Sequence, residues 1–205
     1  VIMQVIGIID DLDSSLNSLS ERLREWYGML SPEKVREVKS HEKLLELLSK
    51  SGKKERGEIR EFSKNLQDFY KTRDSLSRYL ESLCKETIPN LSEVAGPLLA
   101  SRLISLAGGL EKTAKLPSST IQILGAEKAL FRHLKGKGKA PKYGVLFGHP
   151  LIQQAPKQFK GKIARLISAK LSLAAKMDFY SKKNEGKRMR EGLEKRVNEL
   201  FRDEK

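Results

Sequence analysis

The sequence has a single cysteine, Cys84, among 205 residues. One cysteine excludes an intramolecular disulfide framework and any zinc site made of several cysteines, and it fits a reducing compartment. No apolar stretch approaches the roughly 20 residues that cross a bilayer, so we expect no membrane-spanning segment. The only histidines, His41, His133 and His149, show no metal-ligand or triad-like spacing. We therefore expect no metal, no cofactor and no catalytic residue.

Acidic residues are missing from Lys128 to Met177, where fifty residues carry twelve Lys or Arg. Residues 1–111 carry 17 basic and 18 acidic side chains (net −1), and residues 112–205 carry 23 and 8 (net +15). A folded surface normally mixes both signs of charge. A neutral half followed by a basic half indicates a scaffold joined to a binding module. Phosphate is the commonest partner of such a surface, because neutralising it releases condensed counterions.

Strand patterns are almost absent, and the fold class that we predict is all-α. Two heptad seams stand out in the first half of the chain. They comprise Val5, Ile9, Leu12, Leu16, Leu19, Leu23 and Trp26, then Ile59, Phe62, Leu66, Phe69, Arg73, Leu76, Leu80 and Leu83. They predict an antiparallel coiled-coil hairpin arm over residues 1–88, joined to a second helical domain over residues 89–205. An ordinary helical bundle is the alternative.

The second half reads as helices separated by Pro and Gly. Asn90 or Ser92 is expected to cap a helix that runs to Leu106, and Ser118 or Ser119 to cap the next one. Gly125 should interrupt that helix before a run over residues 127–135. A long helix is expected over residues 158–180, and a last helix over residues 185–201.

Ten of the twelve Lys and Arg residues of the acid-free window form three groups. Lys128, Arg132 and Lys135 share one helix face, because they are spaced i, i+4, i+7, and His133 adjoins them. The other two groups are a glycine-rich loop with Lys137, Lys139 and Lys142, and a helix start with Lys157, Lys160, Lys162 and Arg165. Basic residues at a helix N-terminus oppose the macrodipole, which indicates an anion nearby. A solvated basic face is the alternative for any single residue.

Aromatic residues are few in this window. Phe131, Tyr143, Phe147 and Phe159 have no regular spacing. The surface therefore suits phosphates and helical shape more than base stacking. A protein-interaction adaptor that docks an acidic partner is the alternative function, because charge alone does not separate the two.

Four segments resemble the Nop domain. They are Arg102–Gly109, Leu116–Leu134 with its Gly125-Ala126-Glu127-Lys128 core, Pro141–Gly144 and Gly161–Arg165. The resemblance covers residues 90–203, and the heptad region before it is also the family's arrangement. The chain is similar to the archaeal member of the Nop family, the core scaffold subunit of box C/D guide-RNA ribonucleoproteins.

The resemblance implies an RNA-binding, non-catalytic subunit of a complex for guide-directed 2′-O-methylation of rRNA and tRNA. It implies that Gly125, Ala126, Glu127, Lys128 and the following helix bind a kink-turn RNA together with its bound ribosomal-type protein. It also implies self-dimerisation through the coiled coil, for which we expect Leu12, Leu16, Leu19, Leu23, Leu66 and Phe69. An archaeal protein would be cytoplasmic, and a eukaryotic one nucleolar.

The start of the chain departs from the family pattern. After Trp26-Tyr27-Gly28 the family usually continues His-Phe-Pro-Glu-Leu, whereas Met29-Leu30-Ser31-Pro32 follows here, so we expect a shortened arm tip. The chain opens at Val1 inside a periodic pattern, which favours a fragment. The family's N-terminal domain, which binds the methyltransferase fibrillarin, is then the part that is missing.

Overall fold

The protein is all-α in the residues that the computed structural model describes, 1–49 and 57–202, which confirms the predicted fold class. No strand occurs in these residues. None of the helices among them has both the length and the apolar composition needed to cross a membrane. The chain divides into two compact units. Residues 7–79 form the hairpin unit, and residues 1–6 with 80–205 form the second unit.

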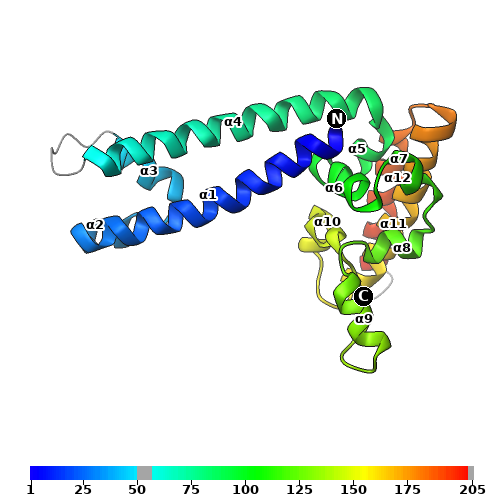
Figure 1. Cartoon of the computed structure of the whole chain (residues 1–205). Coiled ribbons are helices and arrows are strands. Elements are labelled where there is room, and N and C mark those ends of the chain that lie inside the picture. The colour runs from blue at the N-terminus through cyan, green and yellow to red at the C-terminus, as the bar shows by residue number, and fades with distance from the viewer. Residues whose placement is uncertain (50–56, 203–205) are drawn as a thin grey trace. The chain divides into compact units, whose positions relative to one another are not determined.

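The hairpin unit is made of two long helices and a shorter helix that packs on them. Helices α1 (Ile2–Leu30) and α4 (Gly57–Thr87) run antiparallel, and α2 (Pro32–Glu37) and α3 (His41–Ser49) connect them (Figure 1). One core joins α1, α3 and α4, and it consists of Leu16, Leu23, Tyr27, Leu44, Leu45, Leu48, Ile59 and Leu66.

The buried seam of α1 differs from the predicted one at two positions. Leu19 and Trp26 are 38% and 44% exposed, whereas Ser20 and Tyr27 are buried in their place. On α4, Phe69 is likewise exposed. The reason is the third helix. The three buried leucines of α3 need apolar partners, so the buried faces of α1 and α4 turn toward α3, and a strict two-helix seam no longer applies.

Two polar contacts lie within the packing of α1 against α4. The Arg73 Nε donates to Asp13 Oδ1 at 2.8 Å and Nη2 donates to Oδ2 at 3.4 Å. Both side chains are about one-third exposed, and the hydrogen bond to Asp13 raises the pKa of Arg73. The Ser20 and Tyr70 hydroxyls lie 3.4 Å apart. The two long helices are thus joined by polar as well as apolar groups.

Arg24 fixes the end of α2. Its guanidinium donates to the carbonyls of Val35 at 3.2 Å, Val38 at 2.7 Å and Lys39 at 3.0 Å. Carbonyls at a helix C-terminus lack partners within the helix, and a cation there also complements the helix dipole. One side chain of α1 therefore holds the segment that follows it.

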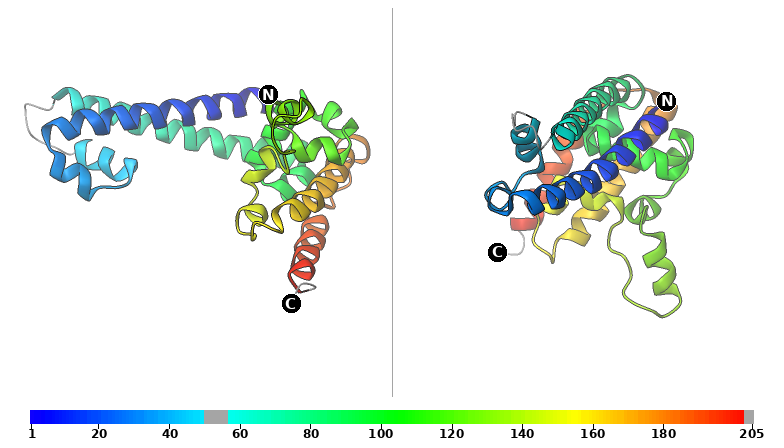
Figure 2. Two further views of the ribbon diagram at one scale, coloured as in Figure 1. Left: turned by 90° about the horizontal axis from the view of Figure 1, so that it is seen from below. Right: turned by 60° about the vertical axis from the view of Figure 1, so that its left-hand side comes forward.

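The second unit is built around α11 (Lys160–Lys176), which buries residues on most of its circumference. Its neighbours include short helices on several sides (Figure 2). They are α5 (Pro89–Ala95), α7 (Leu110–Lys115), α8 (Ser118–Ile123), the 3-10 turn η2 (Val145–Gly148), α10 (Pro150–Gln153), the π-helical turn η3 (Met177–Ser181) and α12 (Gly186–Arg202). Helix α6 (Pro97–Ala107) packs on α5, α7 and η2. Helix α9 (Glu127–Leu134) carries the next loop.

The start of α5 is held by a residue far away in the sequence. The predicted caps, Asn90 and Ser92, lie inside the helix. The helix that was predicted to continue to Leu106 is interrupted at Gly96, whose φ is +81°, and a new helix begins at Pro97. The Asp178 carboxylate of η3 accepts instead from Asn90 N at 3.0 Å, Asn90 Nδ2 at 2.7 Å and Leu91 N at 2.8 Å. Burial raises the pKa of Asp178, and these three hydrogen bonds oppose that shift.

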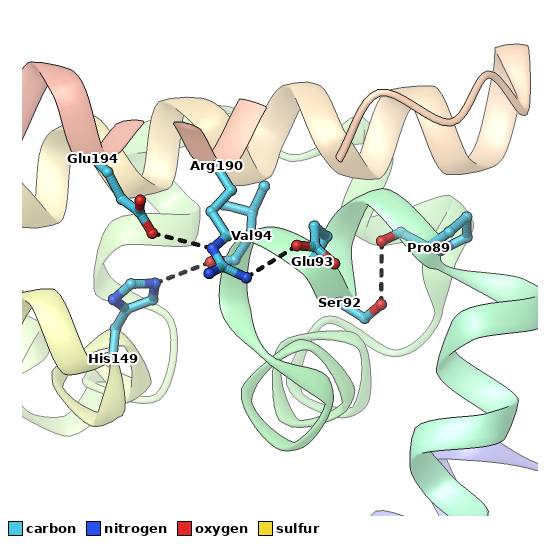
Figure 3. A network of polar contacts seen from close by, with 7 residues as sticks. All are labelled: Pro89, Ser92, Glu93, Val94, His149, Arg190 and Glu194. Atoms are coloured by element: carbon cyan, nitrogen blue, oxygen red, sulfur yellow. Dashed lines mark hydrogen bonds and ion pairs between the residues drawn. The ribbon is translucent and has the colours of Figure 1, made fainter. Parts of the chain in front are cut away.

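Helix α12 and the start of α10 are tied to α5 by a second set of polar contacts (Figure 3). The Arg190 guanidinium donates to Glu93 at 3.0 Å and to Glu194 at 3.1 Å. The buried His149 ring caps α10, because its Nδ1 accepts from Leu151 N at 3.2 Å, while its Nε2 donates to the Val94 carbonyl at 3.0 Å. Burial lowers the pKa of His149.

The last turns of α4 belong to the second unit. Cys84 is fully buried, with its Sγ 3.2 Å from the Ser101 hydroxyl, and burial raises the pKa of the thiol. A buried, protonated thiol is typical of a structural cysteine. The compact units divide between residues 79 and 80, and the functional boundary between residues 88 and 89 stays a prediction.

Candidate nucleic-acid interface

The interface begins at a sharp turn between α8 and α9. Gly125 has φ +82°, a conformation that favours glycine. Its N–H donates to the Glu127 carboxylate at 2.7 Å. The acid that directly precedes the basic window therefore accepts a hydrogen bond from a backbone amide at the start of α9, where the helix dipole also favours a negative charge. Gly125 and Glu127 are exposed and Ala126 is partly exposed.

Helix α9 has two different faces and no buried residue. Lys128, Arg132 and Lys135 are exposed along one side. Phe131 and Leu134, which are 61% and 69% exposed, lie beside that basic row. Figures 1 and 2 show α9 and the following loop extending away from the other helices of the second unit. A basic row next to an apolar row suits a partner with both phosphate and apolar surface.

The basic loop is closed by its own backbone. The Lys137 N–H donates to the Arg132 carbonyl at 2.8 Å, and His133 Nδ1 lies 3.0 Å from the Gly138 carbonyl. Gly136 and Gly138 have φ of +72° and +105°. His133 thus shapes the loop, and Lys137 and Lys139 are exposed on it.

The end of the loop is anchored on α8. Gln122 Nε2 donates to the Lys142 carbonyl at 2.7 Å, and Gly144 N donates to the Gln122 carbonyl at 3.0 Å. A Cβ on Gly144 would lie only 1.9 Å from the Leu124 carbonyl oxygen, so only glycine fits here. The Lys142 side chain reaches Gly161 in the first turn of α11, because its Cδ lies 3.6 Å from the position of a Cβ there.

The first turns of α11 carry the last basic group. Lys162 and Arg165 are exposed, and Lys160 is partly buried, with its Nζ donating to the Gln153 carbonyl at 3.3 Å. No acidic residue occupies the first turn of α11, and no side chain caps it. The uncapped amides and the lysines give this helix end a positive potential.

The structure therefore sorts the predicted residues into two clusters. The α9 cluster comprises Lys128, Arg132, His133, Lys135, Lys137 and Lys139. The α11 cluster comprises Lys142, Lys160, Lys162 and Arg165. Sequence reasoning did not find this division, because it depends on Lys142 folding back to α11 through its anchor on α8.

Sequence reasoning found no pattern among the aromatic residues of the acid-free window and missed that two of them stack on each other. The rings of Tyr143 and Phe147 stack with centroids 5.3 Å apart and planes 14° apart. Lys160 Nζ lies 5.2 Å from the Phe147 centroid. Little in the sequence signals this stacking, because Tyr143 lies outside any helix and only the turn at Gly144 and the 3-10 turn that starts at Val145 bring its ring to Phe147.

The residues expected in self-association fall into two classes. Leu16, Leu23 and Leu66 are buried in the core of the hairpin unit itself, and Leu12 packs partly buried against that core. Leu19 and Phe69 are 38% and 48% exposed. Of the six expected residues, Leu19 and Phe69 are therefore the two that present a substantial apolar surface to another molecule.

Metal chemistry finds no support in the side chains that the structure describes. No group of three or more His, Cys, Asp and Glu residues could hold a metal ion in this part of the chain.

Comparisons with known proteins give the family. A family model described as "Nop: snoRNA binding domain, fibrillarin" matches residues 49–199. A NOP5 family protein of Methanocaldococcus jannaschii is 43% identical over 98% of this chain and 57% of its own length. Nucleolar protein 58 of Scheffersomyces stipitis is 36% identical over 98% of this chain and 47% of its own length.

A solved structure supports the same assignment. The crystal structure of a fibrillarin/Nop5p complex contains a chain with TM-score 0.67 and 28% identity, over 97% of this chain and 67% of that one. The chain spans about half the length of the curated relatives that it matches. Because the family model covers most of the chain, from the end of α3 into α12, the protein belongs to the Nop family.

Proposed function

We propose that this chain is an RNA-binding scaffold of a box C/D ribonucleoprotein that carries out guide-directed ribose 2′-O-methylation of rRNA and tRNA. The observation that carries the proposal is the acid-free basic surface of the α9 and α11 clusters, on a chain of the Nop family. Its part is non-catalytic, and the methyl transfer belongs to a partner.

The α9 cluster fits a composite partner. Its basic row offers three cations about one helical turn apart, which suits successive phosphates of an RNA backbone. The adjacent Phe131 and Leu134 are too exposed to serve the protein's own core, and they suit an apolar protein surface. A kink-turn RNA with its bound ribosomal-type protein presents both surfaces at once. Gly125, Ala126 and Glu127 form the turn before α9, and this turn would orient α9 so that its basic row contacts the RNA and its apolar row contacts the bound protein.

Further partners follow from the relatives. The solved structure is of a complex with fibrillarin, and we propose that fibrillarin binds the family's N-terminal domain rather than the two units described here. Self-association would use the exposed Leu19 and Phe69 of the hairpin unit. The buried Leu16, Leu23 and Leu66 and the partly buried Leu12 would act by keeping α1 and α4 together. The site of action would be the cytoplasm in an archaeon and the nucleolus in a eukaryote.

The test is binding to a preformed complex of kink-turn RNA and its protein. A Lys128→Ala/Arg132→Ala variant should bind more weakly, and its slope of log K against log salt should be shallower by roughly one to two, since each lost phosphate contact accounts for about 0.7–0.9. A matched control, Lys34→Ala/Lys43→Ala, removes two exposed lysines of the hairpin unit and should bind as the wild type does.

Two results would contradict the proposal. Unchanged binding and an unchanged slope in the Lys128→Ala/Arg132→Ala variant would remove the α9 cluster from the interface. Competition by an acidic protein, with no competition by tRNA, would favour the adaptor that docks an acidic partner. Filter binding at several salt concentrations measures both.

A further inference from the structure

The Tyr143–Phe147 pair gives the α11 cluster a property that phosphate binding alone does not use. We propose that an unpaired nucleobase of the bound RNA stacks on the Phe147 ring. The inference rests on the proposed RNA-binding function, and it adds the kind of nucleotide that this end of the surface selects.

The aromatic surface is open to a ligand. The Phe147 side chain is 46% exposed although it already stacks on Tyr143. Every base has a π face, and stacking one on an aromatic side chain contributes strongly to single-strand binding. A base in an intact duplex has both faces covered by its neighbours, so the pair should favour unpaired nucleotides.

The pair is also held in place before any ligand binds. Hydrogen bonds anchor Lys142, Gly144 and Val145 to Gln122 and Leu124 at the end of α8, at distances of 2.7 to 3.0 Å. Leu146, next to Phe147, is fully buried. A ring fixed in this way loses little conformational entropy when a base stacks on it.

Lys160 lies against the ring pair on the side of α11, and a second lysine reaches the same helix end. Lys160 Nζ lies 5.2 Å from the Phe147 centroid, and Lys142 approaches Gly161 in the first turn of that helix. The flexible stem of Lys160 lets its ammonium move from the ring to the phosphate next to a stacked base. A stacking ring combined with cations along the backbone is the general mode of single-strand binding.

Phe131 provides a natural comparison. It is more exposed than Phe147, at 61%, and it lies in the same acid-free window. Tyr143 and Phe147 stack on each other, whereas the residues one turn away from Phe131 along α9 are Glu127, Lys128, Leu134 and Lys135, and none of these is aromatic. We therefore assign base stacking to Phe147 and protein contact to Phe131.

The experiment uses the full chain and a kink-turn RNA with its bound protein. The RNA carries 2-aminopurine at one unpaired nucleotide at a time, and a second RNA has those nucleotides paired. The wild type should quench the fluorescence at one unpaired position. Phe147→Leu, which keeps an apolar side chain but loses the π face, should lose that quench, and Phe131→Leu should keep it.

Affinity gives a second readout. Phe147→Leu should bind the RNA with unpaired nucleotides roughly five- to hundredfold more weakly, the loss that removal of one stacking partner causes. Its slope of log K against log salt should equal that of the wild type, because no charge is removed. Lys160→Ala should make the slope shallower by about 0.7–0.9. The paired RNA should bind Phe147→Leu and the wild type equally.

Three outcomes would overturn the inference. The first is wild-type binding with no quenched position, a readout that needs no variant to fold. The second is full affinity and full quench in Phe147→Leu. The third is an equal loss of affinity for both RNAs, which would place Phe147 against the bound protein. A wild type that binds neither RNA would overturn the proposed function as well.

Discussion

Asp178→Asn tests how the second unit holds the start of α5. The Asp178 side chain is 5% exposed. Its Oδ1 accepts from Asn90 N at 3.0 Å and Asn90 Nδ2 at 2.7 Å, and its Oδ2 accepts from Leu91 N at 2.8 Å. An asparagine keeps one oxygen in place of Oδ1, and its NH₂ group then faces the Leu91 N–H.

The magnitude follows from these three contacts. A buried donor without an acceptor costs about 1–3 kcal/mol, and this applies to the Leu91 N–H. The two remaining hydrogen bonds lose their charge assistance. Burial raises the pKa of Asp178, so the wild-type carboxylate carries a desolvation penalty that the neutral asparagine avoids. This gain offsets the loss of charge assistance in the two remaining hydrogen bonds. We expect the free energy of unfolding of Asp178→Asn to be lower by about 1–3 kcal/mol.

Urea unfolding followed by far-UV circular dichroism measures the change. For a chain of this size, each kcal/mol lowers Tm by about 2–4 °C, so a thermal scan provides a check. The matched control is Asp68→Asn, an exposed carboxylate of α4 that pairs with Lys71. It should leave the midpoint unchanged. If Asp178→Asn unfolded at the same midpoint as Asp68→Asn, the Asp178 carboxylate would not be what holds α5.

Two further predictions concern Gly144 and His149. Gly144→Ala should destabilise the fold by about 1–3 kcal/mol and weaken RNA binding, because its Cβ would meet the Leu124 carbonyl. The control is Gly148→Ala, where the added Cβ has no atom within 4 Å, and both its urea midpoint and its RNA affinity should equal those of the wild type. Burial lowers the pKa of His149 below its ordinary value of 6.5, so the folded state favours the neutral ring. The stability that this preference contributes is fully present above about pH 6.5, and it is lost as the pH falls through the lowered pKa. His149→Asn should flatten the fall in urea midpoint below pH 6.5.

Local signals predicted much of the fold. The last helix was expected at residues 185–201 and occupies Gly186–Arg202, and the helix after Gly125 was expected at residues 127–135 and occupies Glu127–Leu134. Helix ends are set by glycine, proline and charge within a few residues, so these bounds can be read from a short stretch of sequence.

What the sequence did not show depends on distant parts of the chain. The cap of α5 comes from Asp178, so neither Asn90 nor Ser92 was needed for it. Ser20 and Tyr27 replace Leu19 and Trp26 in the buried face of α1 because α3 packs there. In the candidate site, the basic residues were evident from composition, but their division into two clusters and the stacked pair depend on the anchor of Gly144 to α8. Their binding to RNA stays a prediction.

The Asp13–Arg73 ion pair has a consequence for alignment as well as for stability. The shared core with α3 fixes part of the alignment of α1 and α4, but apolar side chains that recur along both helices oppose a slip by one heptad less sharply than a charged pair does. Such a slip would move the Arg73 guanidinium about 10 Å from Asp13, since each residue advances a helix by about 1.5 Å. The charged pair thereby selects one register out of several. The exposed Leu19 and Phe69 are then held at a fixed offset along the hairpin unit, which under the proposed self-association would give a second copy of the chain a single pattern to match.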